Sequence, residues 1–409
     1  MHTREISFSG AGGEPLSARL DLPVGGTPLT CALFAHCFTC SKNLNAVVNI
    51  SRALAQQRIA VLRFDFTGLG ESEGEFAATN FSSNVEDLVA AARFMEGEGL
   101  APAVLIGHSL GGAAVIRAAR RISSARAVVT IGAPFDPWHA SRLFDDSREA
   151  IETAGEAMVD IGGRSFRVRK QLLNDLRSGN LEEDLRELQR PLLIFHSALD
   201  QSVGIENAAE IFHAARHPKS FISLDKANHL LTDERDSRYV AMALAGWASR
   251  YLPEPAVTTP EELRDARVMT TTGNTGYLTE IMAGGHGLIA DEPVGVGGGD
   301  AGPTPYDLIM AALGSCTGMT LRMYADRKGW PLEEVEVRLR HGRVHALDEQ
   351  QCEESEVRVD RIERELEIHG PLDEEQRARL AEIADRCPVH RTLSAGVKIE
   401  TTMAPGEGA

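Results

Sequence analysis

The sequence predicts a mostly parallel α/β sheet with flanking helices and a cap insertion, followed by a second domain of the α+β class. Up to about residue 252, continuous apolar runs of strand length alternate with helical stretches, as in a sheet covered on both faces. After a proline-containing stretch the pattern changes to period-two strands and one long apolar helix. A chain of 409 residues can hold two cores. We therefore predict domains at 1–253 and 265–409, joined by a linker at 254–264.

The composition of the chain limits the classes of binding partner and the cellular compartment that we expect. The formal net charge is -17, and residues 256–409 contribute most of it, with 28 acidic against 16 basic residues. A field of this sign repels phosphate backbones and anionic lipids, so we expect neither nucleic acid nor a membrane as a partner. No apolar run reaches the roughly 18 residues of a membrane span, and the N-terminal residues resemble no signal peptide. We expect a cytoplasmic protein.

The first domain is predicted element by element. Two alternating strands around the turn GAGGEP suggest an antiparallel edge hairpin, and strand and helix then alternate as in right-handed crossovers. The polar stretch at 137–189 interrupts this alternation and predicts the cap. The predicted strands are 5–9, 16–23, 31–35, 59–66, 103–109, 125–134, 191–197 and 220–224, and the predicted helices are 45–57, one starting at Ala113, 207–215 and 239–252.

Ser109 is the first candidate catalytic residue. It lies in the pentapeptide GHSLG, between an apolar strand and a helical stretch. Glycines two positions before and after a serine allow a tight turn that exposes its hydroxyl at the strand tip, beside a helix N-terminus. The pentapeptide is short, so its context decides. Ser109 as an ordinary turn serine is the alternative.

Its partners should lie where other strands end, because ligands bind at the carboxyl ends of strands in open α/β sheets. Asp200 follows one strand and His229 follows another, which gives the order serine, acid, histidine. Asp136 also follows a strand and is a rival for the acid. We expect His108 to be packed or to support the site without reacting, and His36 to be structural.

This part of the chain resembles the α/β-hydrolase family. The resemblance rests on GHSLG, on HSALDQSV and NHLL around the acid and the histidine, on DFTGLGES at 65–72, and on HCF at 36–38, where Cys37 replaces the usual glycine. A serine nucleophile points to carboxylic esters or close acyl relatives, and the resemblance thus implies a carboxylesterase of short to medium acyl esters. In that mechanism His229 takes the proton of Ser109, Asp200 holds the imidazole, and the amides of Phe38 and Leu110 bind the oxyanion.

The six cysteines are distributed over both domains. In a long chain they argue against a disulfide scaffold, and Cys37 and Cys40 form a single pair with no second pair at ligand spacing. We expect no metal and no cofactor. We interpret Cys37 and Cys40 as loop-packing residues, with a redox pair as the alternative. Cys352 lies in an acidic stretch and is interpreted as incidental.

The second domain begins with three predicted strands at 267–273, 277–284 and 287–293. A glycine-rich segment leads to a long apolar helix at 306–329 with Cys316 in its middle. Two period-two strands at 330–345 and 355–370 and a helix at 373–387 follow, and this helix ends at Cys387.

These residues resemble the OsmC/Ohr family of osmotically inducible and organic hydroperoxide resistance proteins. The resemblance rests on ADEP at 290–293, GPTPYDLIMAALGSCTGMTLRMYA, and CPVHRTL at 387–393. It implies that Cys316 attacks an organic hydroperoxide, that Cys387 resolves it by disulfide formation, and that a dithiol restores both. It also implies an intertwined homodimer.

Two positions depart from the peroxidase members of that family. Asn274 stands where the resemblance implies an arginine, and Tyr306, next to Asp307, stands where it implies a glutamate. A thiol in a buried helix needs such a cation to form a thiolate. Two hypotheses therefore remain open for this domain: a thiol peroxidase, or a scaffold that only dimerises and supports the esterase site.

Overall fold

The computed structural model describes residues 2–23, 28–252, 268–273, 276–284, 286–345 and 358–403. The chain divides into two compact units, residues 1–273 with 279–288, and residues 274–278 with 289–409. The predicted linker, Asn274 and Cys352 lie outside the described residues. The predicted domain boundaries therefore remain a prediction. Among the described residues, no helix has the length and apolarity needed to cross a bilayer.

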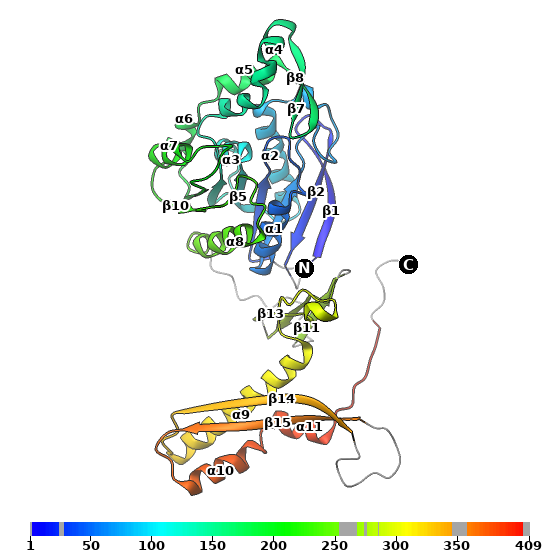
Figure 1. Ribbon diagram of the computed structural model, residues 1–409, viewed down its shortest axis with the longest axis vertical. Coiled ribbons are helices and arrows are strands. Elements are labelled where there is room, and N and C mark those ends of the chain that lie inside the picture. Colours follow the sequence, from blue (N-terminus) through cyan, green and yellow to red (C-terminus); the bar gives the residue numbers. More distant parts are fainter. Residues whose placement is uncertain are drawn as a thin grey trace. The chain divides into compact units, whose positions relative to one another are not determined.

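An eight-stranded sheet forms the centre of the first unit (Figure 1), in the order β1-β2-β4-β3-β5-β6-β9-β10. Strand β2 runs antiparallel to β1 and β4, whereas all other neighbours are parallel. The sheet confirms the predicted fold class, including the edge hairpin. The strands are β1 (His2–Ser9), β2 (Pro15–Leu22), β3 (Thr30–Ala35), β4 (Ile59–Phe64), β5 (Pro102–His108), β6 (Ala127–Ile131), β9 (Leu192–His196) and β10 (Lys219–Ser223).

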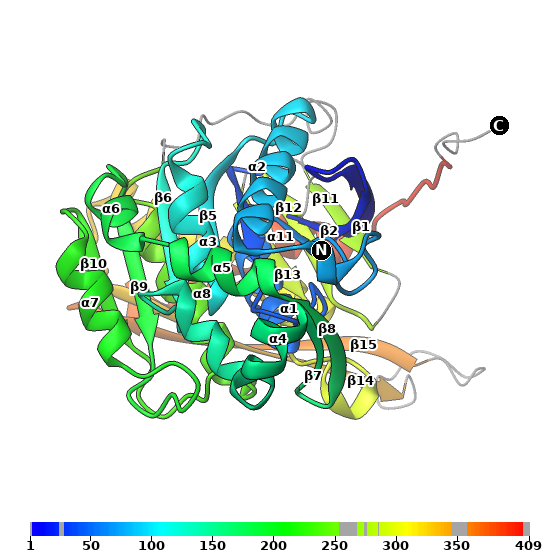
Figure 2. The same cartoon turned by 90° about the horizontal axis from the view of Figure 1, so that it is seen from above.

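Helices cover both faces of this sheet (Figures 1 and 2). Residues of α2 (Phe81–Gly97), α3 (Leu110–Ala119) and α7 (Glu206–Ala214) share one apolar cluster with one face of the sheet. Residues of α1 (Asn45–Gln56) and α8 (Glu234–Ala248) share a second cluster with the other face. Because both faces are covered, β4, β6 and β9 are buried along their whole length, which explains their continuous apolar sequences.

The cap lies between β6 and β9, where the sequence predicts it. Its apolar side chains, including Phe144, Ile151 and Leu173, join the core of the sheet face that carries α2 and α3. The ring of Trp138 contacts two guanidinium groups, with Arg148 at 5.2 Å and Arg177 at 4.5 Å from its centroid. The cap elements are η2 (Pro137–Ser147), α4 (Arg148–Ala154), β7 (Glu156–Ile161), β8 (Arg164–Arg169), α5 (Lys170–Ser178) and α6 (Leu181–Arg186).

The region after residue 268 contains a three-stranded sheet, a long helix and a hairpin. The helix α9 (Pro305–Lys328) begins at a capping box between Thr304 and Asp307. Strands β14 and β15 pair antiparallel beside it (Figure 1), and α9, α10 and the hairpin share a small apolar core. The elements are β11 (Val268–Thr272), β12 (Thr279–Ala283), β13 (His286–Ala290), η4 (Val294–Val296), β14 (Glu334–His345), β15 (Arg358–His369), α10 (Glu374–Ala384) and α11 (Pro388–Ala395).

The glycine-rich segment before α9 folds around the buried carboxylate of Asp291. This carboxylate accepts hydrogen bonds from the backbone amides of Glu292, Gly299 and Ala301 at 2.8, 2.9 and 3.2 Å. A side chain at Gly298 would place its Cβ 1.8 Å from the carbonyl oxygen of Glu292. The run of glycines is therefore needed for a close backbone turn.

Candidate active site

Ser109 occupies the tight turn between β5 and α3. Its backbone has φ +54° and ψ -126°, a conformation that costs a non-glycine residue about 1–3 kcal/mol. A Cβ at Gly107 would lie 2.3 Å from the carbonyl oxygen of Gly111, and a Cβ at Gly111 would lie 2.5 Å from that of Ala35. Both glycines are thus required by close backbone packing, which holds the half-buried serine at the strand tip.

The structure brings Ser109, His229 and Asp200 together. The Nε2 atom of His229 lies 3.0 Å from the Oγ of Ser109, and its Nδ1 lies 2.7 Å from the Oδ2 of Asp200. The three side chains follow β5, β10 and β9, so residues far apart in sequence meet at one edge of the sheet. This is the hydrogen-bond chain that acyl transfer needs between nucleophile, base and orienting acid.

The environment of Asp200 favours its charged form. Its other oxygen accepts hydrogen bonds from the amides of Ser202 and Val203, both at 2.9 Å. Burial alone would raise the pKa of Asp200, but the hydrogen bonds from His229, Val203 and Ser202 outweigh burial and place that pKa below its ordinary value. A carboxylate can only accept, so Nδ1 of His229 carries the proton and Nε2 is free to accept the serine proton.

The rival acid, Asp136, makes different contacts. Its carboxylate accepts a hydrogen bond from the amide of Trp138 at 2.9 Å and caps the first helix of the cap. The described contacts of His229 include Asp200 but not Asp136.

Gly132 is part of the site and was not predicted from the sequence. It follows β6 with φ +56°, and a Cβ there would lie 3.2 Å from Asp200 Oδ2 and 3.3 Å from His229 Nδ1. A side chain there would crowd the hydrogen bond between His229 and Asp200, and the positive φ also favours glycine. The signal in the sequence is a glycine directly after a buried strand, which is too common to identify a site.

The two predicted oxyanion donors lie close together. Phe38 and Leu110 line the same small cavity under the loop after β3. Leu110 is the first residue of α3, so its amide has no acceptor within the helix and lies at the positive end of the helix dipole. Their role as donors remains a prediction.

Cys37 and Cys40 form a disulfide, and the interpretation of these residues as loop-packing thiols is wrong. A turn in which the amide of Cys40 donates to the carbonyl of Cys37 brings their Cα atoms to 5.3 Å, within the range of a disulfide. The bridge encloses Phe38 and Thr39, so it constrains the loop that supplies a predicted oxyanion donor.

A buried lysine also anchors this loop. Lys42 is 1% exposed, and its Nζ lies 2.5 Å from Asp65 and 2.7 Å from Glu71. Asp65 also accepts from the amides of Lys42 at 2.6 Å and Glu71 at 2.9 Å. The hydrogen bond from Lys42 lowers the pKa of Glu71. Asp65 and Glu71 belong to the segment DFTGLGES, so this segment holds the oxyanion loop through Lys42. No pattern in the sequence singles out Lys42.

In the second unit, Cys316 and Cys387 are both free thiols. Cys316 is half-buried in α9, whereas Cys387 is fully buried and its sulfur accepts a hydrogen bond from the amide of His390 at 3.2 Å. The neighbour of Cys316, Thr317, places its hydroxyl 3.7 Å from the sulfur of Cys387. The structure therefore places Cys387 next to the turn of α9 that carries Cys316.

An arginine lies beside this pair. Arg364 donates to the hydroxyl of Thr317 at 3.2 Å and pairs with Asp385 at 2.5 Å. The residues at the position where the resemblance implies a glutamate have other contacts. Tyr306 stacks on His341 with ring centroids 4.3 Å apart, and Asp307 caps α9.

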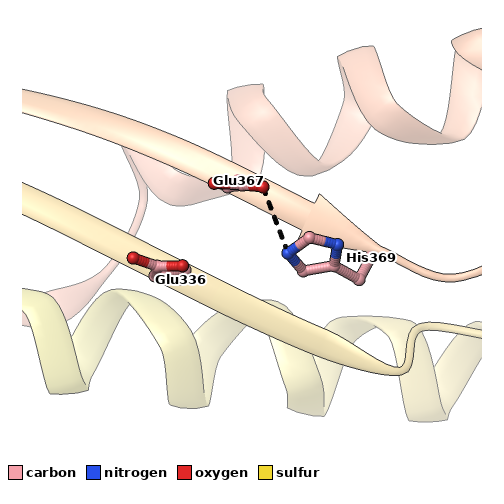
Figure 3. A group of neighbouring side chains, drawn as sticks. All are labelled: Glu336, Glu367 and His369. Atoms are coloured by element: carbon pink, nitrogen blue, oxygen red, sulfur yellow. Dashed lines mark ion pairs between the residues drawn. The ribbon is translucent and has the colours of Figure 1, made fainter.

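Glu336, Glu367 and His369 form a group on β14 and β15 whose donor atoms lie within 4.8 Å of one another (Figure 3). Arg338 lies between the two carboxylates, 2.8 Å from an oxygen of each. A guanidinium thus already neutralises the carboxylates that a cation would need, and the group supports no metal site.

The parallel sheet, the serine at the turn after β5 and the hydrogen-bonded histidine and aspartate define an α/β hydrolase. The chain belongs to this family: the family described as "Alpha/beta hydrolase family" matches residues 32–296. The family described as "OsmC-like protein" matches residues 297–402, so an OsmC-like domain follows.

Solved structures agree with the family. The esterase domain of a Rhodothermus marinus protein is 54% identical, with 62% of this chain and 100% of that domain covered and a TM-score of 0.52. Est1E from Butyrivibrio proteoclasticus, solved with ferulic acid, is 19% identical, with 60% and 98% covered and a TM-score of 0.52, which shows the fold alone. A comparison with curated proteins found no match.

Proposed function

We propose that this chain is a serine carboxylesterase. The hydrogen-bond chain of 3.0 Å and 2.7 Å from Ser109 through His229 to Asp200 is the observation that supports this function best. The 54% identical domain from Rhodothermus marinus is an esterase domain, which supports an ester as the substrate class. The substrate is a small carboxylic ester.

The reaction follows from the positions of these groups. His229 removes the hydroxyl proton of Ser109 as the oxygen attacks the ester carbonyl, and the amides of Phe38 and Leu110 stabilise the oxyanion. The proton then passes to the leaving alcohol, which leaves an acyl group on Ser109. His229 next activates a water molecule that releases the acid and restores the serine.

We expect the esterase to prefer short to medium acyl groups. The ring of Phe38 lies 5.7 Å from that of Phe76 and 6.2 Å from that of Phe144 in the cap. These ring contacts join the oxyanion loop to the cap, so we expect the cap to limit the length of the acyl chain. A series of nitrophenyl esters from acetate to palmitate tests this, with kcat/KM expected to fall steeply for the longest chains.

The test of the esterase itself is hydrolysis of p-nitrophenyl butyrate by the wild type and by Ser109→Ala. We expect the wild type to turn over this ester and the variant to lose at least about 10⁴-fold in kcat, because the nucleophile and its base act as a unit. Activity retained by the folded variant would overturn the proposal.

For the OsmC-like domain, we propose a second activity as a thiol peroxidase. Cys316 as thiolate would attack the hydroperoxide oxygen and release an alcohol, and the sulfenic acid would condense with Cys387 to a disulfide and water. A dithiol would then reduce that disulfide. The guanidinium of Arg364 supports this proposal, because it donates to Thr317, the neighbour of Cys316, whereas the sequence has Asn274 where the resemblance implies an arginine.

The alternative is a domain that dimerises and has no chemistry of its own. Consumption of cumene hydroperoxide with dihydrolipoamide, measured for the wild type, Cys316→Ser and Arg364→Gln, separates the two hypotheses. The peroxidase proposal expects activity in the wild type and its loss in Cys316→Ser. Absence of consumption by the wild type would favour the scaffold.

We also propose a homodimer formed through this domain. Ile309, Met319 and Met323 of α9 are 40%, 66% and 72% exposed. A groove between α9 and β14 is lined mainly by small and apolar side chains, namely Met310, Ala311, Gly314, Ser315, Gly318, Val335, Val337 and Leu339. Exposed apolar surface on a long helix is typical of a protein interface, and the resemblance makes a second copy of the chain its occupant.

A further inference from the structure

Three buried histidines stand at the carboxyl ends of three parallel strands of the first unit. His36 directly follows β3, and His108 and His196 are the last residues of β5 and β9. Their exposed fractions are 1%, 2% and 0%. The proposed reaction uses none of these rings.

Each ring contacts one carbonyl oxygen in a loop of the active site. His36 Nδ1 lies 2.7 Å from the carbonyl of Cys37, His108 Nε2 lies 2.7 Å from that of His229, and His196 Nε2 lies 2.8 Å from that of Val203. A carbonyl oxygen can only accept, so the contacting nitrogen of each ring carries the hydrogen. The second nitrogen of each ring, His36 Nε2, His108 Nδ1 and His196 Nδ1, is buried without a hydrogen bond among the described residues. His36 Nε2 does lie 3.9 Å from the Oδ1 of Asp65, which is beyond hydrogen-bond distance.

The three carbonyls belong to the three loops that the reaction needs. Cys37 precedes the predicted oxyanion donor Phe38, and His229 is the base itself. Val203 donates its own amide to Asp200 at 2.9 Å. The ring of His108 also lies against the imidazole of His229, with centroids 5.1 Å apart.

We propose that His36, His108 and His196 are positioning residues, each a neutral imidazole that fixes one loop of the catalytic site through a single N–H to carbonyl hydrogen bond. This inference rests on the proposed esterase function. The bonds act on kcat because a displacement of about 1 Å in a reacting group can lower the rate about 100-fold. They contact no substrate.

The buried surroundings keep these rings neutral. At His108 and His196, a proton on the second nitrogen would create a buried donor with no acceptor among the described residues, which is costly. At His36 the carboxylate of Asp65 lies 3.9 Å from this nitrogen, but burial and the cations Lys42 and Arg164 oppose its protonation. Burial is the main cause that lowers the pKa of His108, to about 3, and it also lowers the pKa of His36 and of His196. The charged or titratable groups that face His36 are Asp65, Lys42 and Arg164. His108 is faced by His229, Asp200 and His36. His196 is faced by Asp200, His229 and Glu206.

The choice of ring nitrogen gives a test by reciprocal rescue. A glutamine amide can place its N–H near the position of Nε2, whereas an asparagine amide reaches only the position of Nδ1. At His108 and His196 we expect Gln to retain at least about tenfold more kcat than Asn, with KM changed less than about threefold. At His36 the ranking should reverse, with Asn better than Gln. His213→Gln, at a histidine of α7 outside the site, is the matched control and should leave kcat unchanged.

The outcomes distinguish a failure of the positioning role from a failure of the proposed esterase function. If the wild type hydrolyses p-nitrophenyl butyrate through Ser109 but Gln and Asn rank alike at all three positions, the positioning role is overturned. If the wild type shows no hydrolysis that depends on Ser109, the proposed function fails. Nitrogen-15 NMR of the imidazoles is independent of turnover: it should show neutral rings at pH 7, protonated at Nδ1 in His36 and at Nε2 in His108 and His196. The opposite tautomers or charged rings would contradict the inference.

Discussion

At the scale of single residues, the site depends on which side chains the ends of the strands carry. Ser109, Asp200 and His229 were predictable because each follows an apolar run of strand length, and the ends of parallel strands meet at one edge. Lys42 and Gly132 were not predictable, since their importance lies in contacts with residues that are distant in sequence. The disulfide between Cys37 and Cys40 was missed because the turn that joins them has no signature beyond their spacing.

The first prediction concerns the identity of the acid. Asp200→Asn should lower kcat by about 10⁴-fold, because an amide at this position favours the wrong tautomer of His229. Asp136→Asn, at the rival acid, should change kcat by less than about tenfold, since an amide oxygen can still cap the helix. Initial rates on p-nitrophenyl butyrate decide this. The reverse ranking would assign the acid to Asp136.

At the scale of elements, strand and helix alternation predicted every parallel strand of the large sheet. The helix α3 begins at Leu110, earlier than the expected Ala113. The reason is that the positive φ of Ser109 turns the chain from strand to helix within this single residue. The helix α2 and the elements of the cap were not predicted, since their sequences are polar on one side and are stabilised by packing against the sheet. In the second domain, α11 follows Cys387 although a single helix ending there was expected.

The second prediction tests the turn after β6. Gly132→Ala should lower the free energy of unfolding by about 1–3 kcal/mol through its positive φ, and should also lower kcat by pushing apart Asp200 and His229. Gly155→Ala is the control, because Gly155 has φ +88° but a Cβ there would meet nothing within 4 Å. Urea unfolding and ester hydrolysis should show a stability loss in both variants and a loss of kcat only in Gly132→Ala. Equal kcat in the two would mean that Gly132 has no role in the site.

At the scale of the whole molecule, the fusion of two domains was predictable from the change in sequence pattern. Two families match successive parts of the chain. The oligomeric state does not follow from the sequence patterns, because an interface depends on the fit between two folded surfaces.

The third prediction concerns pH. The pKa values of His36, His108 and His196 are lowered in the folded chain from an ordinary value of 6.5. The unfolded chain therefore binds more protons, so these residues contribute their stability above about pH 6.5 and lose it as the pH falls. For His108 the loss continues to about pH 3. Between about pH 6.5 and pH 3, the ring of His108 should contribute about 1.4 kcal/mol per pH unit to the slope of unfolding free energy. The rings of His36 and His196 should add to this slope in the same direction.

Urea unfolding of the wild type and of His108→Gln between about pH 7 and pH 4 measures this slope. The variant should show a slope smaller by about 1.4 kcal/mol per pH unit below about pH 6.5. Identical slopes would mean that the ring of His108 titrates in the folded state as it does in the unfolded one.

The fourth prediction concerns assembly. Light scattering of the wild type should give the mass of two chains, and Met319→Glu with Met323→Glu should shift it toward one, because two carboxylates would be buried in an apolar interface. Met242→Glu is the control, since Met242 lies on α8 in the first unit and is 61% exposed. A monomeric wild type would contradict the proposed dimer.

The measurement that tests the central claim most directly is covalent labelling of the intact chain with a fluorophosphonate, followed by peptide mass spectrometry. An activated serine in this site should react at Ser109 alone, with loss of ester hydrolysis in step with labelling, and His229→Gln should slow the reaction by several orders of magnitude. An adduct at another residue, or full esterase activity after Ser109 is labelled, would contradict the proposed esterase site.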